Sequence, residues 1–287
     1  MSDTLLTVQA QVVAAFVDER DGGNLAAVVL DRPDLSEAQM QSIAAQLGFP
    51  ESAFVTDVPD GFRFDVFTPN RRVPDCGHAT IAAFGLLAQR GRFSQTTIKQ
   101  TTVGPRTIRV AADGSVVMQQ PPASFTEVVD AHAIAASLGL QADCFASIPI
   151  VARNDVAFLL APFGRAHDLV TIVPDMPAIQ AISNRLDVYG YYVYAPADGV
   201  DATIRMFAPR IAIPEESATG MAAGMLAGYL HATRPDRPTL LRFDQGVFMQ
   251  PPSPSRLNAT IEREGDVVTA IWVGGYARTR EVRTLVV

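Results

Sequence analysis

The chain has 287 residues, of which 48% are hydrophobic and 18% are charged, a balance typical of folded proteins and unlike that of disordered ones. Its formal charge is -7 and its basic residues are scattered, so we expect no nucleic acid as a partner, because phosphate binding needs a dense cationic face. Two cysteines and four histidines without clustered spacing, and no glycine-rich phosphate loop, lead us to expect neither a metal nor an organic cofactor.

The N-terminal segment, MSDTLLTVQAQ, has neither the basic start nor the apolar core of a signal peptide. No stretch of the chain approaches the roughly 20 apolar residues of a membrane helix. We therefore expect a cytoplasmic protein with no membrane partner.

Short β-branched segments, separated by Gly, Pro and Asp, predict strands along the whole chain. These segments are 9–15, 26–30, 107–110, 116–119, 191–194, 267–273 and 281–287. Capping residues predict two outer helices, at 34–47 before Gly48 and at 130–138 before Gly139. Strands and helices are thus mixed along the chain.

A nine-residue pattern occurs twice, at an offset of 140 residues. FTPNRRVPD at 67–75 and FAPRIAIPE at 207–215 both read F-x-P-x-x-x-[VI]-P-acid. Each copy follows a strand-like segment and leads into an Ala-rich apolar run. The strand-like segments are 61–67 and 202–207, and the apolar runs are 78–89 and 220–231.

The two apolar runs are hydrophobic on nearly every side, so each is predicted to be a helix surrounded by its own half of the chain. The predicted fold class is α+β, with two pseudo-symmetric lobes, each a barrel-like, mostly antiparallel sheet wrapped around a central helix. The Pro121-Pro122 stretch places the boundary between an N-terminal lobe at 1-122 and a C-terminal lobe at 123-287. The C-terminal strand, 279-287, is a candidate to complete the first lobe.

The first turns of these helices suggest a binding site. Helices that begin at Gly77/His78 and Gly220/Met221 would present unpaired N–H groups and the positive end of the helix dipole. If the halves face each other, these ends would hold a carboxylate and stabilise enolate-like charge. Glu51, between an apolar loop and an apolar strand, is the candidate base, although a Glu after Pro is also a common solvated turn residue.

Several blocks of the sequence together resemble the phenazine biosynthesis PhzF family. They occur in the family's order and span most of the chain: VAAF and GNLAAVV from 13 to 29, PESAF at 50–54, FTP and CGHAT from 67 to 80, FAP and EESATG from 207 to 220, and QG at 245–246. The resemblance implies a diaminopimelate epimerase-like fold, a homodimer, and catalysis without a metal or organic cofactor. It also implies an isomerase.

By position, the resemblance makes Glu51 the general acid/base that shifts a proton within a small amino- or hydroxy-carboxylate metabolite. The amides of both helix starts would hold the carboxylate, while His78 and Glu216 would contact its substituents. The full set of implied substrate-binding residues is Asn24, Cys76, Gly77, His78, Glu216, Thr219, Gly220 and Met221.

This chain departs from the family pattern at Ala14, Arg72, Glu216 and Met221. The family often has acids at the first two positions, Asp at the third and Ser at the fourth, so the substrate stays open. One alternative is a binding protein that keeps the cleft without catalysis. Another is a two-thiol racemase or epimerase, which needs a second cysteine where this chain has Thr219.

Overall fold

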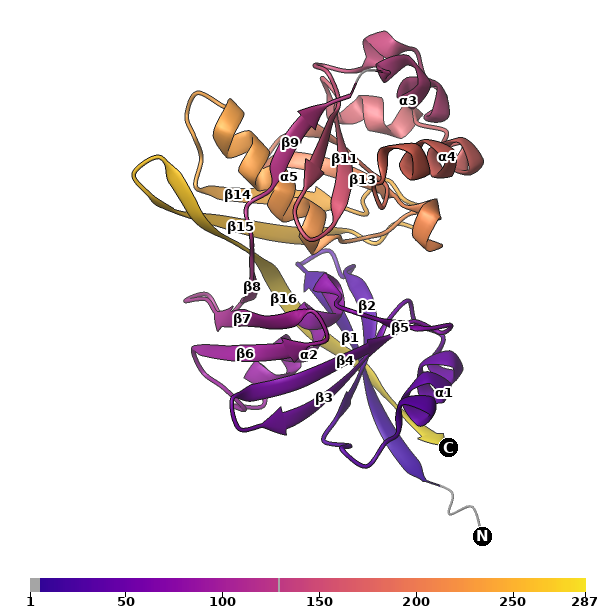
Figure 1. Ribbon diagram of the computed structural model, residues 1–287, viewed down its shortest axis with the longest axis vertical. Coiled ribbons are helices and arrows are strands. Elements are labelled where there is room, and N and C mark those ends of the chain that lie inside the picture. Colours follow the sequence, from indigo (N-terminus) through magenta and orange to yellow (C-terminus); the bar gives the residue numbers. More distant parts are fainter. Residues whose placement is uncertain (1–5, 129) are drawn as a thin grey trace. The chain divides into compact units, whose positions relative to one another are not determined.

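The computed structural model describes residues 6–128 and 130–287, so the first five residues of the predicted lobe 1-122 lie outside it. The chain divides into two compact units (Figure 1). Of the described residues, unit 1 comprises 6–17, Asn24–Gln119 and Gly274–Val287, and unit 2 comprises Asp18–Gly23 and those within Gln120–Val273. Residues 274–287 thus fall in unit 1, and residues 18–23 fall in unit 2.

Unit 1 contains a closed barrel of eight described strands. In spatial order they are β1 (Thr7–Val17), β2 (Asn24–Leu30), β3 (Ser52–Val58), β4 (Gly61–Phe67), β6 (Thr96–Thr101), β7 (Gly104–Val110), β8 (Val116–Gln120) and β16 (Val267–Val286). Antiparallel pairing of β1 with β16 closes the ring. The pairs β2–β3 and β4–β6 are parallel, and the short β5 (Arg72–Val73) pairs with β4 in antiparallel orientation.

Helix α2 (Gly77–Gln89) is the central helix of unit 1. Every residue from Gly77 to Leu87 is buried, and the helix contacts β1, β2 and β3. Phe84 packs against the rings of Phe62 and Phe64 on β4. A helix that is apolar on all sides needs such a surround, which is the physical reason for the barrel.

Helix α1 (Glu37–Leu47) packs its apolar residues against Val8, Val29 and Phe54 of the strands. Its predicted start at residue 34 is three residues early, because Ser36 is the N-cap and forms a capping box with Gln39. Its end is as predicted: Gly48 adopts the left-handed conformation, with φ of 69°, that a residue with a side chain rarely adopts.

Unit 2 wraps a row of strands around helix α5 (Gly220–Thr233). The row runs from the first part of β16 through β15 (Ser255–Glu264), β14 (Leu240–Gln245), β13 (Val200–Phe207), β12 (Tyr191–Ala197), β11 (Ala157–Pro162) and β10 (Ile150–Arg153) to β9 (Ser124–Glu127). Helix α5 contacts β15 near one end of this row and both β10 and β11 near the other. The sheet must therefore curve around the helix, and the predicted α+β fold with a central helix in each lobe is confirmed.

The smaller helices of unit 2 lie between its strands in the chain. They are α3 (Ala131–Ser137), α4 (Met176–Leu186) and the 3-10 segments Ala142–Cys144, Ala166–Thr171 and Pro209–Ile211. Helix α3 agrees with the prediction at 130–138, with Asp130 as its N-cap. Helix α4 was not predicted, although Asp175 caps it. None of the helices in the described part of the chain has the length and apolarity needed to cross a bilayer.

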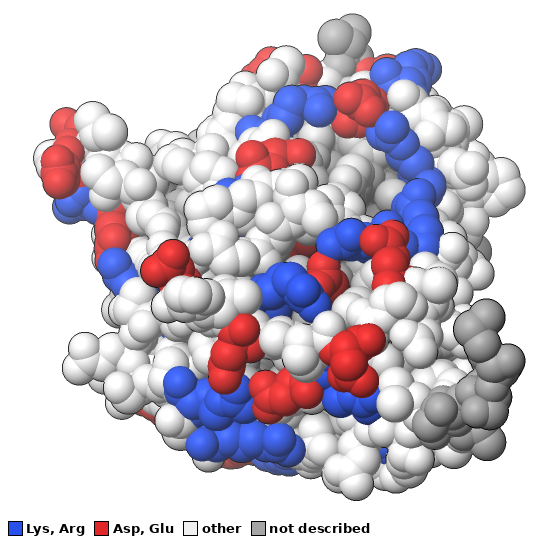
Figure 2. Space-filling view, turned by 60° about the horizontal axis from the view of Figure 1, so that its bottom comes forward, with Lys and Arg blue, Asp and Glu red and all other residues white. Residues whose placement is uncertain are grey.

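The surface carries charges of both signs. On the face drawn in Figure 2, basic and acidic side chains are interspersed. Ion pairs such as Arg32–Asp34 and Arg92–Asp31, at 2.7 and 2.9 Å, join neighbouring groups of this kind.

The strands predicted at 267–273 and 281–287 are one continuous strand, β16. The glycines between them suggested a break. Gly274 instead permits a close approach, because a Cβ at this position would lie 1.8 Å from the Val116 carbonyl oxygen. The glycine thus lets β16 pass β8 without a kink.

We expect Gly274→Ala to lower the free energy of unfolding by at least about 2 kcal/mol, because the backbone of β8 would have to move. Gly164→Ala is the matched control, since a Cβ added there would meet nothing within 4 Å and its backbone needs no glycine. Urea unfolding of the two variants measures the difference. Equal stabilities would show that β16 has room at Gly274.

Candidate functional site

Glu51 lies immediately before β3, where the chain returns from α1. Its side chain is 10% exposed, and its backbone oxygen accepts a hydrogen bond from the Ala27 amide at 3.1 Å. Asn24, 5% exposed, begins β2, the parallel neighbour of β3. Parallel pairing therefore brings these two predicted residues to the same end of adjacent strands.

The start of α2 brings two more predicted residues to Glu51. Cys76 is the N-cap of the helix, Gly77 its first residue and His78 its second. His78 Nε2 lies 3.1 Å from Glu51 Oε2, and His78 Nδ1 lies 3.5 Å from Cys76 Sγ. The imidazole therefore stands between the carboxylate and the thiol, and all three side chains are buried.

The Glu51 carboxylate retains capacity to accept hydrogen bonds. Although His78 Nε2 is within ion-pair distance of Glu51 Oε2, that oxygen accepts no hydrogen bond from the described residues. A buried polar atom without a hydrogen bond lowers the stability of the folded state. Such an atom in a native protein therefore calls for an explanation.

Burial raises the pKa of the Cys76 thiol, and the negative charge of Glu51 adds to the increase while His78 opposes it. The thiol is therefore neutral around neutral pH. A neutral thiol is a poor nucleophile and a poor base.

The ligand atoms of Glu51, Cys76 and His78 all lie within 4.8 Å of one another, and these donor types can bind zinc. The carboxylate and the thiol nevertheless approach opposite nitrogens of the imidazole. One metal ion binds only one of these nitrogens, so these two contacts of the ring do not together form a chelate.

Arg72, one of the departures from the family pattern, is neutralised within unit 1. Its guanidinium pairs with Asp65 on β4 and, at 3.0 Å, with Glu37 on α1. Its guanidinium carbon also lies 5.9 Å from the centre of the Phe67 ring. The change to a basic residue therefore adds no uncompensated charge.

Unit 2 holds the other predicted residues around the start of α5. Thr219 is the N-cap, and its hydroxyl donates to Glu216 Oε2 at 2.6 Å. Gly220 is buried and Met221 is partly exposed. The loop 216–219 is thus folded back on itself just before the helix.

Gln245, at the end of β14, holds this loop, a role that sequence reasoning missed. Its amide nitrogen donates to the Glu216 carbonyl at 2.8 Å and to the Thr219 hydroxyl at 3.0 Å. Its oxygen accepts from the Thr219 amide and from the Tyr192 hydroxyl, both at 3.1 Å. The sequence shows the Gln-Gly pair at 245–246, but it does not show which residues Gln245 contacts.

A family model described as phenazine biosynthesis-like protein (PhzC-PhzF) matches residues 13–282. The chain belongs to this family. An uncharacterized isomerase of Deinococcus radiodurans is 34% identical over 92% of this chain and 90% of the relative. The trans-2,3-dihydro-3-hydroxyanthranilate isomerase of Pseudomonas aeruginosa is 32% identical over 92% of this chain and 94% of the relative.

Among solved structures, a PhzF family protein of Bacillus anthracis superposes with a TM-score of 0.88 at 21% identity, covering 98% of this chain and 100% of its own. This likeness shows a shared fold. Together with the relatives named as isomerases, family membership makes the chain an isomerase.

We expect Cys76 to react with iodoacetamide at least about tenfold more slowly in the folded protein than in the urea-unfolded chain at pH 7.5, because its raised pKa leaves little thiolate. The rate should keep rising as the pH passes 9. A Cys144→Ser background removes the second thiol, whose pKa burial raises to about 11. A labelling rate that levels off below pH 8 would contradict this expectation.

Proposed function

We propose that this isomerase shifts a proton between carbons of a small amino- or hydroxy-carboxylate, with Glu51 as the general acid/base. The observation that carries the proposal is the buried Glu51 carboxylate, which lies beside His78 at the start of a buried helix with an oxygen free to accept a proton. A base of this kind must reach the substrate carbon directly and must exclude water from the proton it holds.

The first turn of α2 suits the substrate carboxylate. The Thr80 amide donates to the Cys76 carbonyl oxygen at 3.1 Å, which is the first backbone hydrogen bond of the helix. The amides of Gly77 and His78 precede it, at the positive end of the helix dipole. We assign the carboxylate to these amides, which also stabilise the charge that develops when a proton leaves the neighbouring carbon.

His78 orients the base in this proposal. Its ring lies between the carboxylate and a neutral thiol, so it can hold Glu51 in place and pass a proton along the row. We propose Glu216, Thr219, Gly220 and Met221 of unit 2 as further substrate-binding residues. Met221 contributes no hydroxyl, so the substrate group recognised at this position differs from one that a Ser would bind.

A two-thiol racemase is disfavoured on two grounds. The residue before Gly220 is Thr219, whose hydroxyl is engaged with Glu216. Burial also keeps the thiol of Cys76 protonated by raising its pKa. A mechanism with two thiols needs one thiolate and one thiol on opposite faces of the substrate.

The test is incorporation of solvent deuterium into candidate substrates, followed by mass spectrometry. The first compound is trans-2,3-dihydro-3-hydroxyanthranilate, named for the Pseudomonas relative, and a panel of small amino- and hydroxy-carboxylates follows. We expect Glu51→Gln to reduce the exchange rate at least about 100-fold, because the amide cannot accept the proton. Glu264→Gln, which changes an exposed carboxyl group of β15, should leave the rate unchanged.

Two outcomes would overturn the proposal. Equal exchange in the wild type and Glu51→Gln would remove Glu51 from the chemistry. A compound that raises the thermal midpoint by binding, while neither protein exchanges its protons, would favour the binding protein on the same fold.

A further inference from the structure

Lys99 is a fully buried lysine that the proposed chemistry does not use. It is the one buried residue of β6, and its ammonium lies 5.0 Å from the centre of the Phe64 ring and 3.3 Å from Met118 Sδ. Burial lowers its pKa, while Asp75 opposes the shift. An apolar side chain would fill this space without the cost of desolvating a charge, so the lysine calls for another explanation.

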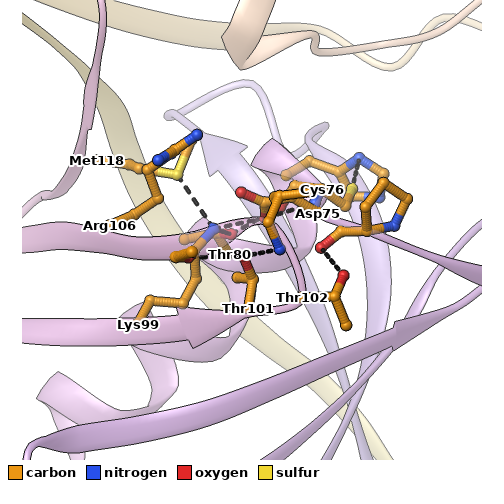
Figure 3. Close-up of polar contacts among 12 residues, drawn as sticks. Asp75, Cys76, Thr80, Lys99, Thr101, Thr102, Arg106 and Met118 are labelled. Carbon is orange, nitrogen blue, oxygen red and sulfur yellow. Dashed lines mark hydrogen bonds and ion pairs between the residues drawn. The ribbon is translucent and has the colours of Figure 1, made fainter. Parts of the chain in front are cut away.

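The ammonium of Lys99 donates hydrogen bonds to one residue before Cys76 and to one residue after it. It donates to Asp75 Oδ1 at 2.5 Å and to Thr80 Oγ1 at 2.9 Å (Figure 3). Asp75 is the acid that closes the first copy of the repeated pattern, and Thr80 lies in the first turn of α2.

The same two residues hold both backbone polar groups of Cys76. The Cys76 amide donates to Asp75 Oδ1 at 2.7 Å, and the Thr80 hydroxyl donates to the Cys76 carbonyl at 2.6 Å. The hydrogen bonds therefore form a closed ring that runs from Lys99 through Asp75, the Cys76 backbone and Thr80. This ring fixes the direction of the peptide that leads into Gly77 and His78.

The second copy of the pattern has a comparable pair built from other residues. Glu215, which matches Asp75, accepts two hydrogen bonds from Arg205, at 2.8 and 2.9 Å, and Arg205 is 8% exposed. Arg205 comes from the strand before the pattern, whereas Lys99 comes from a strand after the central helix. In both units a buried cation pairs with the acid that closes the repeated pattern ahead of the central helix.

We propose that Lys99 is a positioning residue, which acts through Asp75 and Thr80 to aim the first amides of α2 and the ring of His78. It touches neither Glu51 nor the proposed substrate position in any described contact. The consequence for catalysis rests on the proposed function, but the effect on the geometry of the first turn does not.

The test is the double variant Lys99→Met/Asp75→Asn, which removes both charges and keeps the side-chain volume and an oxygen for the Cys76 amide. Amide hydrogen exchange and the ¹⁵N signals of the His78 ring are followed by NMR. We expect the amides of residues 76–79 to exchange about tenfold faster or more, since charged hydrogen bonds are lost, and the His78 signals to shift. Amides of residues 86–89 should keep their rates.

The matched control is Arg205→Met/Glu215→Gln, which should affect the first turn of α5 and leave that of α2 unchanged. If the first double variant does not fold, Thr80→Val breaks the ring by removing a hydroxyl at constant shape, and the same local change is expected. Unchanged exchange at 76–79, or faster exchange across all of α2 with unmoved His78 signals, would overturn the proposal.

Measurements of activity distinguish the proposed function from the proposed positioning role of Lys99. When a substrate has been found, the double variant should lose kcat while KM changes less, because the proton-transfer geometry is disturbed more than binding. If no compound exchanges with the wild type, the proposed function fails while the NMR result still decides the role of Lys99.

Discussion

Helix α2 is buried on every side, and unit 1 can enclose it only because β16 returns from the end of the chain to pair with β1. The start of the helix is enclosed as well, and the first amides of any helix cannot be satisfied by carbonyl groups of the helix itself. Side chains or a ligand must satisfy them. The side chains of Cys76, His78 and Glu51 lie together at this buried helix start, where polar groups interact more strongly than in water.

The two units meet this requirement with different residues. In unit 1, the charged pair Lys99–Asp75 holds the backbone before α2. In unit 2, the neutral amide of Gln245 holds the loop before α5, and all four of its hydrogen-bonding positions are used. Unit 1 also keeps a buried carboxylate, that of Glu51, with an oxygen that accepts no hydrogen bond from the described residues, and the proposed role of Glu51 as the acid/base depends on this feature.

Local patterns were enough to predict much of this. The repeat located both central helices, and the block CGHAT with PESAF placed Cys76, His78 and Glu51 among the candidates. The features that could not be predicted from the sequence depend on contacts between distant segments. Lys99 stands in the polar run TTIKQT and reads as a surface residue, because its partners Asp75 and Thr80 lie about twenty residues away. The sequence also predicted separate strands at 267–273 and 281–287, because the close approach of Val116 to Gly274 within one continuous strand depends on a distant segment.

The most direct measurement is a crystal structure of the protein with a bound, unreactive carboxylate such as 3-hydroxyanthranilate. We expect the ligand carboxylate to accept hydrogen bonds from the amides of Gly77 and His78, with a ring carbon about 3.5 Å or less from a Glu51 oxygen. A ligand bound away from the start of α2, or one that leaves Glu51 out of reach of every carbon, would contradict the assignment of Glu51 as the acid/base.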